Sequence, residues 1–523
     1  MSHPVHDHLI VGAGPAGLQL AAELQRDGRD YLVLEGGERP GGFFEVFPRH
    51  RKLISINKPH TGSTDPEFNL RMDWNSLLSD DPSLLFTRYS ERYFPSADDL
   101  VRYLADFAET LGLNIRYGAR VERVERDGAL FQVTDGTGAV HRGRRLIMAT
   151  GVSKPYVPDV PGIETAEYYT DVSVDPADFT DQRVLILGKA NSALETADNL
   201  IETATVIHLA GPGSLRLAWQ SHFVGHVRAV NNNFLDTYQL KSQNAILDGE
   251  AASVERRDDG YAVRFRFSRA DDFIKEIHYD RVIVATGFRF DASVFADDCR
   301  PRLVIKDRFP EMTSAYESVN VPGLYFAGTL MQQRDFKKST GGFIHGFRYA
   351  VRALGRILGE RHHDTAWPGR EVPAEPAALA AELLARLNRT SALWQQFGQL
   401  ADLVATAGAG LRHYEEVPVD YAHDTGFADA ENLFVITLEY GPDHDKIDPF
   451  DVTVRRVRQD DAEDAHDAAY LHPVVRHYRR GQFTAAHHVA ENLENEWDRP
   501  AAHHEPLTAF LAKALADAPE AVR

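Results

Sequence analysis

The chain has 523 residues, which is long for one domain, and 43% of them are hydrophobic, as expected for a globular protein with a full core. Its formal net charge of −20 argues against nucleic acid or an anionic membrane as the main partner. The single cysteine, Cys299, excludes an intramolecular disulfide framework and a Cys-x-x-Cys redox pair, and we expect it to be an inert small side chain.

A glycine-rich loop, Gly12–Gly17, separates a predicted apolar strand at His8–Val11 from a predicted helix at Leu18–Gln25. A second predicted strand, Tyr31–Leu34, leads directly to Glu35. This order of strand, loop, helix, strand and acid is typical of dinucleotide-binding domains, in which the acid binds a ribose hydroxyl. Glu35 favours an unphosphorylated ribose, and therefore FAD or NAD rather than NADP.

Each glycine of this loop has a physical role in binding a diphosphate. Gly12 permits the tight turn, Gly14 lets the backbone approach the pyrophosphate, and Gly17 lets the helix pack on the strand. The positive end of the helix dipole then faces the diphosphate. The alternative is a tight turn with no ligand. The predicted contacts here are Gly12, Gly14, Pro15, Ala16, Gly17, Glu35 and Gly36.

A second loop, Gly188–Ala193, follows the predicted strand Arg183–Leu187 and opens a predicted helix at Ser192–Ile201. The next strand, Thr205–Leu209, ends without a carboxylate, and Arg216 follows it. A missing acid and a nearby arginine suit the 2′-phosphate of NADP, although Arg216 is equally compatible with a solvated loop. The residues predicted to bind NADPH are Gly188, Asn191, Ser192, Glu195 and Arg216.

Two further segments point to flavin. The glycine pair before Phe343 opens a predicted helix that runs to about Arg352, and its amides suit the flavin N1–C2=O edge, where reduction builds negative charge. A simple helix start is the alternative. Asn57 is the predicted catalytic residue, because its amide can hydrogen-bond a flavin C4a-hydroperoxide. Since Asn57 precedes Lys58 and Pro59, an ordinary turn residue is the other interpretation.

Two similar Ala-Thr-Gly segments, Ala149–Gly151 and Ala285–Gly287, each end a predicted strand and indicate one dinucleotide domain inserted into another. The predicted fold class is α/β, with two Rossmann-like dinucleotide-binding domains and a C-terminal α-rich extension. The predicted boundaries are 1–175 and 291–370 for the two parts of the FAD domain, 176–290 for the NADPH domain, and 371–523 for the extension. The histidines of the extension have no metal-ligand spacing, so we predict no metal site and expect them on the surface.

This arrangement resembles the flavin-containing monooxygenase superfamily, the class B flavoprotein monooxygenases, over roughly residues 5–360. Gly41–Phe44 resembles the Gly-Gly-x-Trp segment of that family, and 52–58 resembles the segment with its flavin-proximal asparagine. The closest resemblance is to the subfamily of FAD-dependent oxidoreductase domain-containing protein 2, carried by 47–53, 71–78, 215–240 and 339–349. The predicted FAD contacts therefore also include Gly42, Phe43, Phe44, Val121, Gly151, Gly328, Thr329, Gly341, Gly342 and Phe343.

One segment departs from the family pattern. The monooxygenase fingerprint, Phe-x-Gly-x-x-x-His, has its histidine near the domain hinge, whereas Glu167–Ser173 contains neither that histidine nor that glycine. The resemblance implies an FAD- and NADPH-dependent monooxygenase acting through a flavin C4a-hydroperoxide on a nucleophilic N or S, and less readily on a ketone. The departure keeps open an NADPH oxidase or dehydrogenase without oxygenation. A flavin-bearing adaptor is the third hypothesis.

The expected partners are dioxygen and a small-molecule substrate, with no nucleic acid and no membrane, and a homo-oligomer is left open. No apolar run reaches the roughly 18 residues that span a bilayer. Because the first predicted strand begins near residue 8, we expect no cleavable signal peptide and a cytoplasmic protein.

Overall fold

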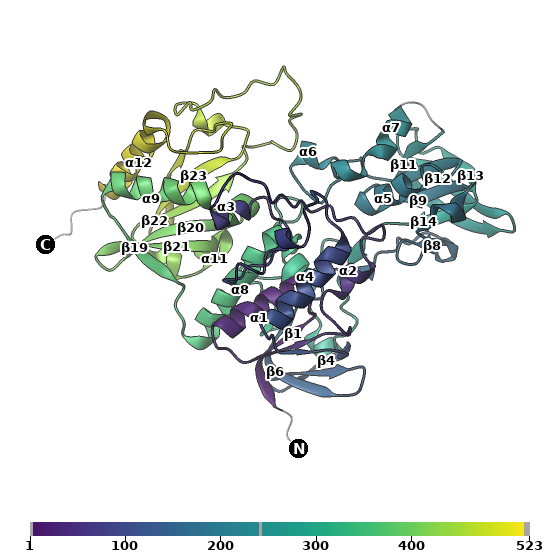
Figure 1. Cartoon of the computed structure of the whole chain (residues 1–523), viewed down its shortest axis with the longest axis horizontal. Coiled ribbons are helices and arrows are strands. Elements are labelled where there is room, and N and C mark those ends of the chain that lie inside the picture. Colours follow the sequence, from purple (N-terminus) through teal and green to yellow (C-terminus); the bar gives the residue numbers. More distant parts are fainter. Residues whose placement is uncertain (1–3, 240–242, 517–523) are drawn as a thin grey trace.

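The computed structural model describes residues 4–239 and 243–516. Residue 240, the end of one segment that carries the family resemblance, lies outside this range. Three lobes are visible in Figure 1: a lower lobe with the N-terminus, a second lobe made of the middle of the chain, and a third lobe that contains the C-terminal region.

The first lobe is built on a seven-stranded sheet with the order β3-β2-β1-β6-β5-β4, in which β18 also pairs with β6. Its strands are β1 (Val5–Val11), β2 (Tyr31–Leu34), β3 (Ile115–Arg116), β4 (Val121–Asp127), β5 (Leu130–Asp135), β6 (Val140–Met148) and β18 (Leu324–Phe326). The pairing of β1 with β2 and β6 is parallel, as is that of β18 with β6. Because β18 comes after the whole second sheet, the chain returns to the first sheet at this strand.

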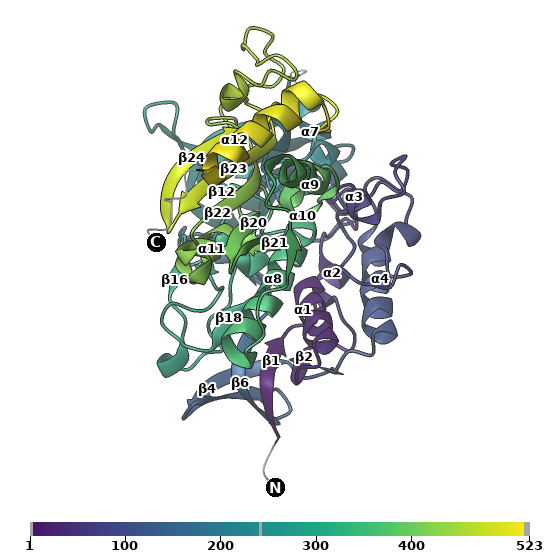
Figure 2. The ribbon, with the colours of Figure 1, turned by 90° about the vertical axis from the view of Figure 1, so that its left-hand side faces the viewer.

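Helices α1 (Pro15–Arg26), α4 (Ala97–Thr110) and α8 (Ile344–His363) belong to the same lobe. Figure 2 shows α1 and α8 side by side, and the two helices contact each other along their length. One face of α4 is apolar and buried, including Leu100, Tyr103, Leu104 and Phe107. Short helices α2 (Gly42–Val46) and α3 (Pro66–Asn69) lie in the segment before α4. The 3₁₀ helix η6 (Gly328–Gln333) connects β18 to the approach to α8.

The second lobe has its own seven-stranded sheet, with the order β13-β12-β11-β10-β9-β14-β8. Its strands are β8 (Glu167–Tyr168), β9 (Arg183–Leu187), β10 (Val206–Gly211), β11 (Ala245–Arg257), β12 (Gly260–Phe267), β13 (Ile274–Tyr279) and β14 (Arg281–Val284). Its helices are α5 (Asn191–Leu200), α6 (Ala218–Ser221) and α7 (Asn233–Gln239). The short strands β7 (Lys154–Pro155) and β15 (Phe288–Arg289) pair where the chain passes between the lobes.

The third lobe contains a six-stranded sheet with the order β19-β21-β20-β22-β23-β24. Its strands are β19 (Gly369–Val372), β20 (Leu400–Ala407), β21 (Gly410–Pro418), β22 (Leu433–Glu439), β23 (His472–Arg479) and β24 (Gln482–His488). Its helices are α9 (Pro376–Arg389), α10 (Ala392–Gln395), α11 (Val419–Asp424) and α12 (Glu505–Ala516). The prediction of an α-rich extension therefore found the helices and missed an antiparallel sheet.

Buried charges explain why this sheet was missed. Asp402 on β20 and Glu416 on β21 are 1% and 3% exposed, and both lie beside the buried guanidinium of Arg386 on α9. Polar residues on the inner face interrupt the alternation of apolar and polar residues that identifies a strand in sequence. The expectation of surface histidines is also wrong for four residues, which are buried: His413, His472, His477 and His503.

Candidate functional site

The first glycine loop has the geometry that a diphosphate requires. Gly12 has a φ of 100°, and a Cβ atom on it would lie 2.9 Å from the carbonyl oxygen of Ala149. A Cβ atom on Gly17 would lie 1.9 Å from the Gly12 carbonyl oxygen, whereas one on Gly14 would have no atom within 4 Å. Gly12 and Gly17 are therefore needed for packing, and Gly14 borders open space where a ligand fits.

Helix α1 begins beside that open space. Gly14 is its N-cap and no side chain caps it, so the first amides of α1 are free to bind an anion. The carboxylate of Glu35 accepts hydrogen bonds from the amides of Ala13 at 2.7 Å and Gly37 at 2.8 Å. Each carboxylate oxygen keeps a further lone pair for a ribose hydroxyl, so these residues fit the adenosine diphosphate part of FAD.

The returning segment packs directly on the first loop. A Cβ atom on Gly328 would lie 2.4 Å from the Cβ atom of Ala16. The Thr329 hydroxyl donates to the carbonyl of Gly342 at 3.2 Å, and α8 starts after Phe343 without a side-chain cap. The first loop and residues 328–344, which are far apart in sequence, thus meet at one place, with two uncapped helix N-termini available to negative charge.

The other residues predicted to contact FAD lie at several separate positions in the chain. Gly36 packs against Arg120, since a Cβ atom there would lie 3.3 Å from the Arg120 Cβ, and Val121 follows at the start of β4. Gly151 has a φ of 61° and open space beside it. Gly42 begins α2, and Phe44 packs against the main core.

Phe43 lies at the junction of the lobes instead. Its side chain is 46% exposed, and its ring is 6.4 Å from that of Phe288, just beyond the second sheet. Phe47 joins the same group, with ring centroids 5.0 Å from Phe43 and 5.3 Å from Phe288.

The second glycine loop closes onto the end of β14. Gly188 has a φ of 145°, and a Cβ atom on it would lie 2.3 Å from the carbonyl oxygen of Ala285. Ser192 lines a pocket at the carboxyl end of the second sheet, together with Tyr168 and Gly287. Ligands of open α/β sheets bind at this edge, so the pocket lies where a nicotinamide nucleotide is expected.

Asn191 uses its side chain to position a neighbouring loop. Its Oδ1 accepts from the amide of Arg228 at 3.0 Å and from Nδ2 of Asn231 at 3.1 Å. Its Nδ2 donates to the carbonyl of His226 at 2.8 Å. Only the backbone of Asn191 is left for direct contact with a nucleotide.

Glu195 lies in the middle of α5 and contacts the hydroxyl of Tyr169. Burial raises the pKa of the Glu195 carboxyl to about 7. The Tyr169 hydroxyl also accepts a hydrogen bond from the backbone amide of Arg49 at 3.2 Å, and its ring stacks on Phe47. The segment that lacks the fingerprint histidine therefore supplies a tyrosine that joins the two lobes.

Arg216 is exposed and makes no ion pair within the described residues. The pKa of His226 is lowered to about 4, first by burial and then by the charges of Lys337 and Arg216. The pKa of Lys337 is lowered as well, by burial and then by Arg308 and Arg216. Cations from both lobes thus repel one another here, and an anion such as a 2′-phosphate would relieve that repulsion.

Asn57 is 1% exposed, and its Nδ2 donates to the carbonyls of Ser90 at 2.6 Å and Arg92 at 3.3 Å. Both amide hydrogens are therefore used within the protein. Its Oδ1 is buried and has no hydrogen-bond partner within the part of the chain that the structure describes. The oxygen, and not the NH₂ group, is the atom left for a ligand.

Sequence reasoning missed an aromatic group centred on His345, which is 1% exposed on the first turn of α8. Its ring stacks on Trp74 with centroids 4.0 Å apart, and neither ring nitrogen has a hydrogen-bond partner among the described residues. Arg228 reaches over Trp74 from the second lobe, at 5.2 Å from the ring. His345 closely follows the Gly341–Phe343 segment in sequence, and this position could have identified it. No spacing in the sequence indicated Trp74.

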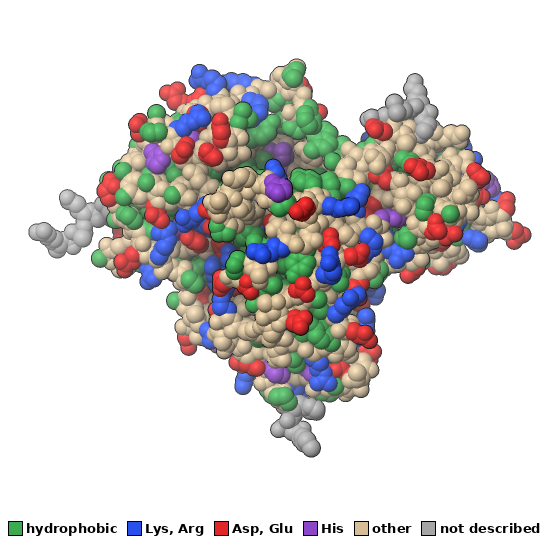
Figure 3. Space-filling model, viewed as in Figure 1, with side chains coloured by type: hydrophobic (Ala, Val, Ile, Leu, Met, Phe, Trp, Pro, Cys, Tyr) green, Lys and Arg blue, Asp and Glu red, His purple; other side chains and the backbone are tan. Residues whose placement is uncertain are grey.

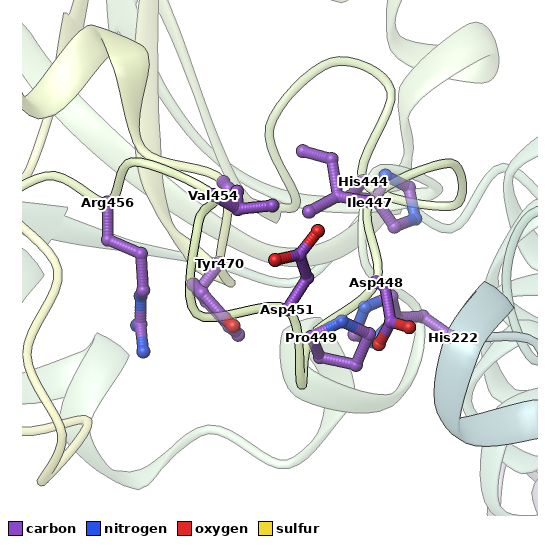
Figure 4. Close-up of a pocket in the computed structure, with 10 residues that line it drawn as sticks. His222, His444, Ile447, Asp448, Pro449, Asp451, Val454, Arg456 and Tyr470 are labelled. Atoms are coloured by element: carbon purple, nitrogen blue, oxygen red, sulfur yellow. The ribbon is translucent and has the colours of Figure 1, made fainter.

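A further pocket lies between the second lobe and the extension, outside all the predicted cofactor residues. Figure 4 shows His222, which follows α6, near His444 and Asp448 of the long loop after β22. The ring of His222 is 4.5 Å from that of Tyr440. Figure 3 shows hydrophobic side chains gathered in the hollow between these lobes, with acidic and basic side chains interspersed over the rest of that face.

Two dinucleotide loops of this geometry, one on a domain inserted into the other, define a flavoprotein oxidoreductase that exchanges electrons with a nicotinamide nucleotide. The family model described as pyridine nucleotide-disulphide oxidoreductase matches residues 9–328. The chain belongs to this family and, within it, to the group of FAD-dependent oxidoreductase domain-containing protein 2. This confirms the predicted resemblance, the α/β fold with two dinucleotide domains, and the cofactor pair FAD and NADPH at the level of the family.

Similar proteins support this assignment. FAD-dependent oxidoreductase domain-containing protein 2 of Mus musculus is 41% identical over 98% of this chain and 84% of its own length. A flavin-containing monooxygenase from Stenotrophomonas maltophilia has the same fold, with a TM-score of 0.53 and 21% identity over 68% of this chain and 98% of its own. The bacillithiol disulfide reductase of Bacillus cereus also has a TM-score of 0.53, with 18% identity over 69% of this chain and 100% of its own. Within residues 4–239 and 243–516, no helix is long and apolar enough to cross a membrane.

Proposed function

We propose that this protein is a monooxygenase that oxidises NADPH, reduces dioxygen and transfers one oxygen atom to a nucleophilic N or S of a small molecule. The observation that carries this proposal is the combination of two fitting dinucleotide sites with a single cysteine. Cys299 is fully buried, its thiol donates to the carbonyl of Val124 at 3.3 Å, and burial raises its pKa to about 11. Electrons therefore have no dithiol on this chain through which to leave, and dioxygen is the simplest acceptor.

FAD, when bound, supplies the redox chemistry by accepting a hydride from NADPH and passing two electrons to dioxygen. The uncapped amides of α1 would hold its diphosphate, and Glu35 would hold its ribose. The uncapped start of α8 would stabilise the negative charge that builds on reduction. Arg216 would bind the 2′-phosphate of NADPH.

Residues from both lobes would keep water away from the reacting groups. His345 and Trp74 form a buried stack on the first lobe, and Arg228 covers Trp74 from the second. A ring of Phe223 lies 5.9 Å from Phe343 across the same junction. In the overall reaction NADPH, a proton, dioxygen and the substrate give NADP⁺, water and the oxygenated product, so exclusion of bulk water favours oxygen transfer over release of peroxide.

A second candidate is an NADPH oxidase, which gives NADP⁺ and hydrogen peroxide and oxygenates no substrate. Its supporting observation is that the NH₂ group of Asn57 is already bonded to two backbone carbonyls. A donor predicted to act on bound oxygen is therefore occupied.

The ratio of hydrogen peroxide formed to NADPH consumed distinguishes the two. We expect a thioether or tertiary amine accepted as substrate to lower this ratio well below one, and to carry label from ¹⁸O-labelled dioxygen in its product. If the ratio of hydrogen peroxide to NADPH stays at one with every such compound and no product carries the label, only the oxidase function remains. Unchanged NADPH oxidation in the presence and absence of dioxygen would contradict both.

A further inference from the structure

A polar cavity separates the first lobe from the C-terminal extension, away from the junction of the two dinucleotide lobes. Its volume is about 690 Å³ including its open mouth. One wall is the segment from η6 to α8, and the other consists of residues 396–399 and 418–420 of the extension. Of the residues predicted to contact a cofactor, only Gly341 lines it. The cavity therefore contains neither glycine-rich loop, although Gly341 of the predicted flavin segment borders it.

Asp335 is the unusual group in this cavity, because its carboxylate is buried and only one of its oxygens has a hydrogen-bond partner among the described residues. The residue is 2% exposed, and its Oδ2 accepts a hydrogen bond from the Gly341 amide at 2.7 Å. Its Oδ1 has no hydrogen-bond partner among the residues that the structure describes. Leaving a buried carboxylate oxygen without a partner is costly, so the site calls for a donor, and a cationic donor best of all.

The charged side chains near Asp335 differ in whether they are already paired. Arg334 forms an ion pair with Asp420 of the extension and donates to the carbonyl of Met312 at 3.2 Å. Lys338 lines the same cavity, is exposed, and has no ion pair within the described residues. Its backbone amide donates to the carbonyl of Asp335 at 2.8 Å, which fixes the two residues as neighbours. The cavity is thus lined by one buried carboxylate with a single unpartnered oxygen and by one exposed ammonium group that has no ion pair among the described residues.

We propose that this cavity binds a small zwitterion of the amino-acid type, with its ammonium group on Asp335 and its carboxylate on Lys338. An ammonium group supplies the donor that Oδ1 lacks, and a carboxylate pairs with the free Lys338 cation. Both charges of such a ligand are compensated within one cavity, whereas an amine or a carboxylate alone satisfies only one of the two groups. This inference does not depend on the redox reaction.

The pKa of Asp335 is raised to about 7 by burial, against the lowering effects of the Gly341 amide and the Lys338 charge. The other titratable or charged groups around the cavity are Tyr316, Arg334 and Asp420. Because an ammonium ligand needs an ionised carboxylate, its affinity should rise with pH up to about 7 and level off above it.

Calorimetric titration of the FAD-loaded full chain with L-alanine, propionate and ethylamine tests the proposal. These three probes carry both charges, the carboxylate alone and the ammonium group alone. We expect L-alanine to bind at one site at least tenfold more tightly than either other probe. Equal affinities for the three probes, or no binding of L-alanine, would overturn the proposal.

Variants assign the two charges to their residues. Asp335→Asn keeps an oxygen for the Gly341 amide but loses the negative charge, and should weaken L-alanine at least tenfold. Lys338→Gln, at an exposed position that tolerates substitution, should weaken the binding of L-alanine by a similar factor. If Asp335→Asn fails to fold, the affinity of Lys338→Gln for L-alanine tests the proposal by itself. Asp198→Asn is the matched control, since the Asp198 carboxylate also has a buried oxygen without a partner but lies on α5. Unchanged affinity in Lys338→Gln would refute the assignment.

Discussion

The hydroxyl of Tyr169 lies against the carboxylate of Glu195, and the same hydroxyl accepts a hydrogen bond from the Arg49 amide 120 positions earlier in the chain. This contact joins the two dinucleotide lobes next to the second glycine loop. It also buries a carboxylate whose pKa is raised to about 7.

The raised pKa makes Glu195 a source of pH-dependent stability. The unfolded chain releases this proton near the ordinary value of 4.5 and the folded chain near 7, so the unfolded state binds fewer protons in that interval. The contribution of Glu195 to the free energy of unfolding should therefore fall as pH rises from about 4.5 to 7, and stay constant above. We expect a loss on the order of 3 kcal/mol that Glu195→Gln removes. Thermal unfolding of both proteins across this range measures it, and parallel curves would contradict it.

Gly14 and Gly17 should respond differently to the same substitution. A side chain at Gly14 meets no protein atom, so Gly14→Val should fold and yet fail to retain FAD. At Gly17 the new Cβ would lie 1.9 Å from a carbonyl oxygen, so Gly17→Val should destabilise the chain itself. Flavin absorbance per chain and circular dichroism of the flavin-free proteins separate the two effects. Full flavin content in a folded Gly14→Val variant would show that the diphosphate lies elsewhere.

Arg216 should carry most of any preference for NADPH over NADH. A charge-assisted contact to the 2′-phosphate is worth roughly 1.5–3 kcal/mol, so Arg216→Ala should lower kcat/KM for NADPH about ten- to a hundredfold and leave NADH unchanged. Lys337→Ala should lower kcat/KM for NADPH by a smaller factor, because the charge of Arg216 contributes to the lowered pKa of Lys337. Arg264→Ala, an exposed arginine on β12, is the control. Equal kcat/KM for the two nucleotides in the unmodified protein would contradict the assignment.

Substitution of Asn57 should affect the reaction of the flavin with dioxygen and not its reduction by NADPH. If its unpaired Oδ1 contacts the oxygen species at the flavin, Asn57→Ala should leave flavin reduction by NADPH nearly unchanged and raise the share of electrons released as hydrogen peroxide. The peroxide yield per NADPH measures this share. An unchanged yield would show that Asn57 serves only to hold the carbonyls of Ser90 and Arg92.

Local patterns predicted much of this molecule. The strands Tyr31–Leu34 and Arg183–Leu187 have the predicted bounds, because short apolar runs between glycines and charged residues leave little freedom. The pairing of His345 with Trp74 could not be predicted, since it depends on how distant segments meet in the folded chain. The sheet of the extension was missed because Asp402 and Glu416 occupy its inner face, where Arg386 neutralises them.

Anaerobic titration of the FAD-loaded protein with NADPH, followed by admission of dioxygen, tests the central claim most directly. We predict that one NADPH per FAD bleaches the flavin absorbance completely, and that dioxygen then restores it. Flavin that stays oxidised with excess NADPH would contradict the account, as would NADPH-reduced flavin that dioxygen does not reoxidise.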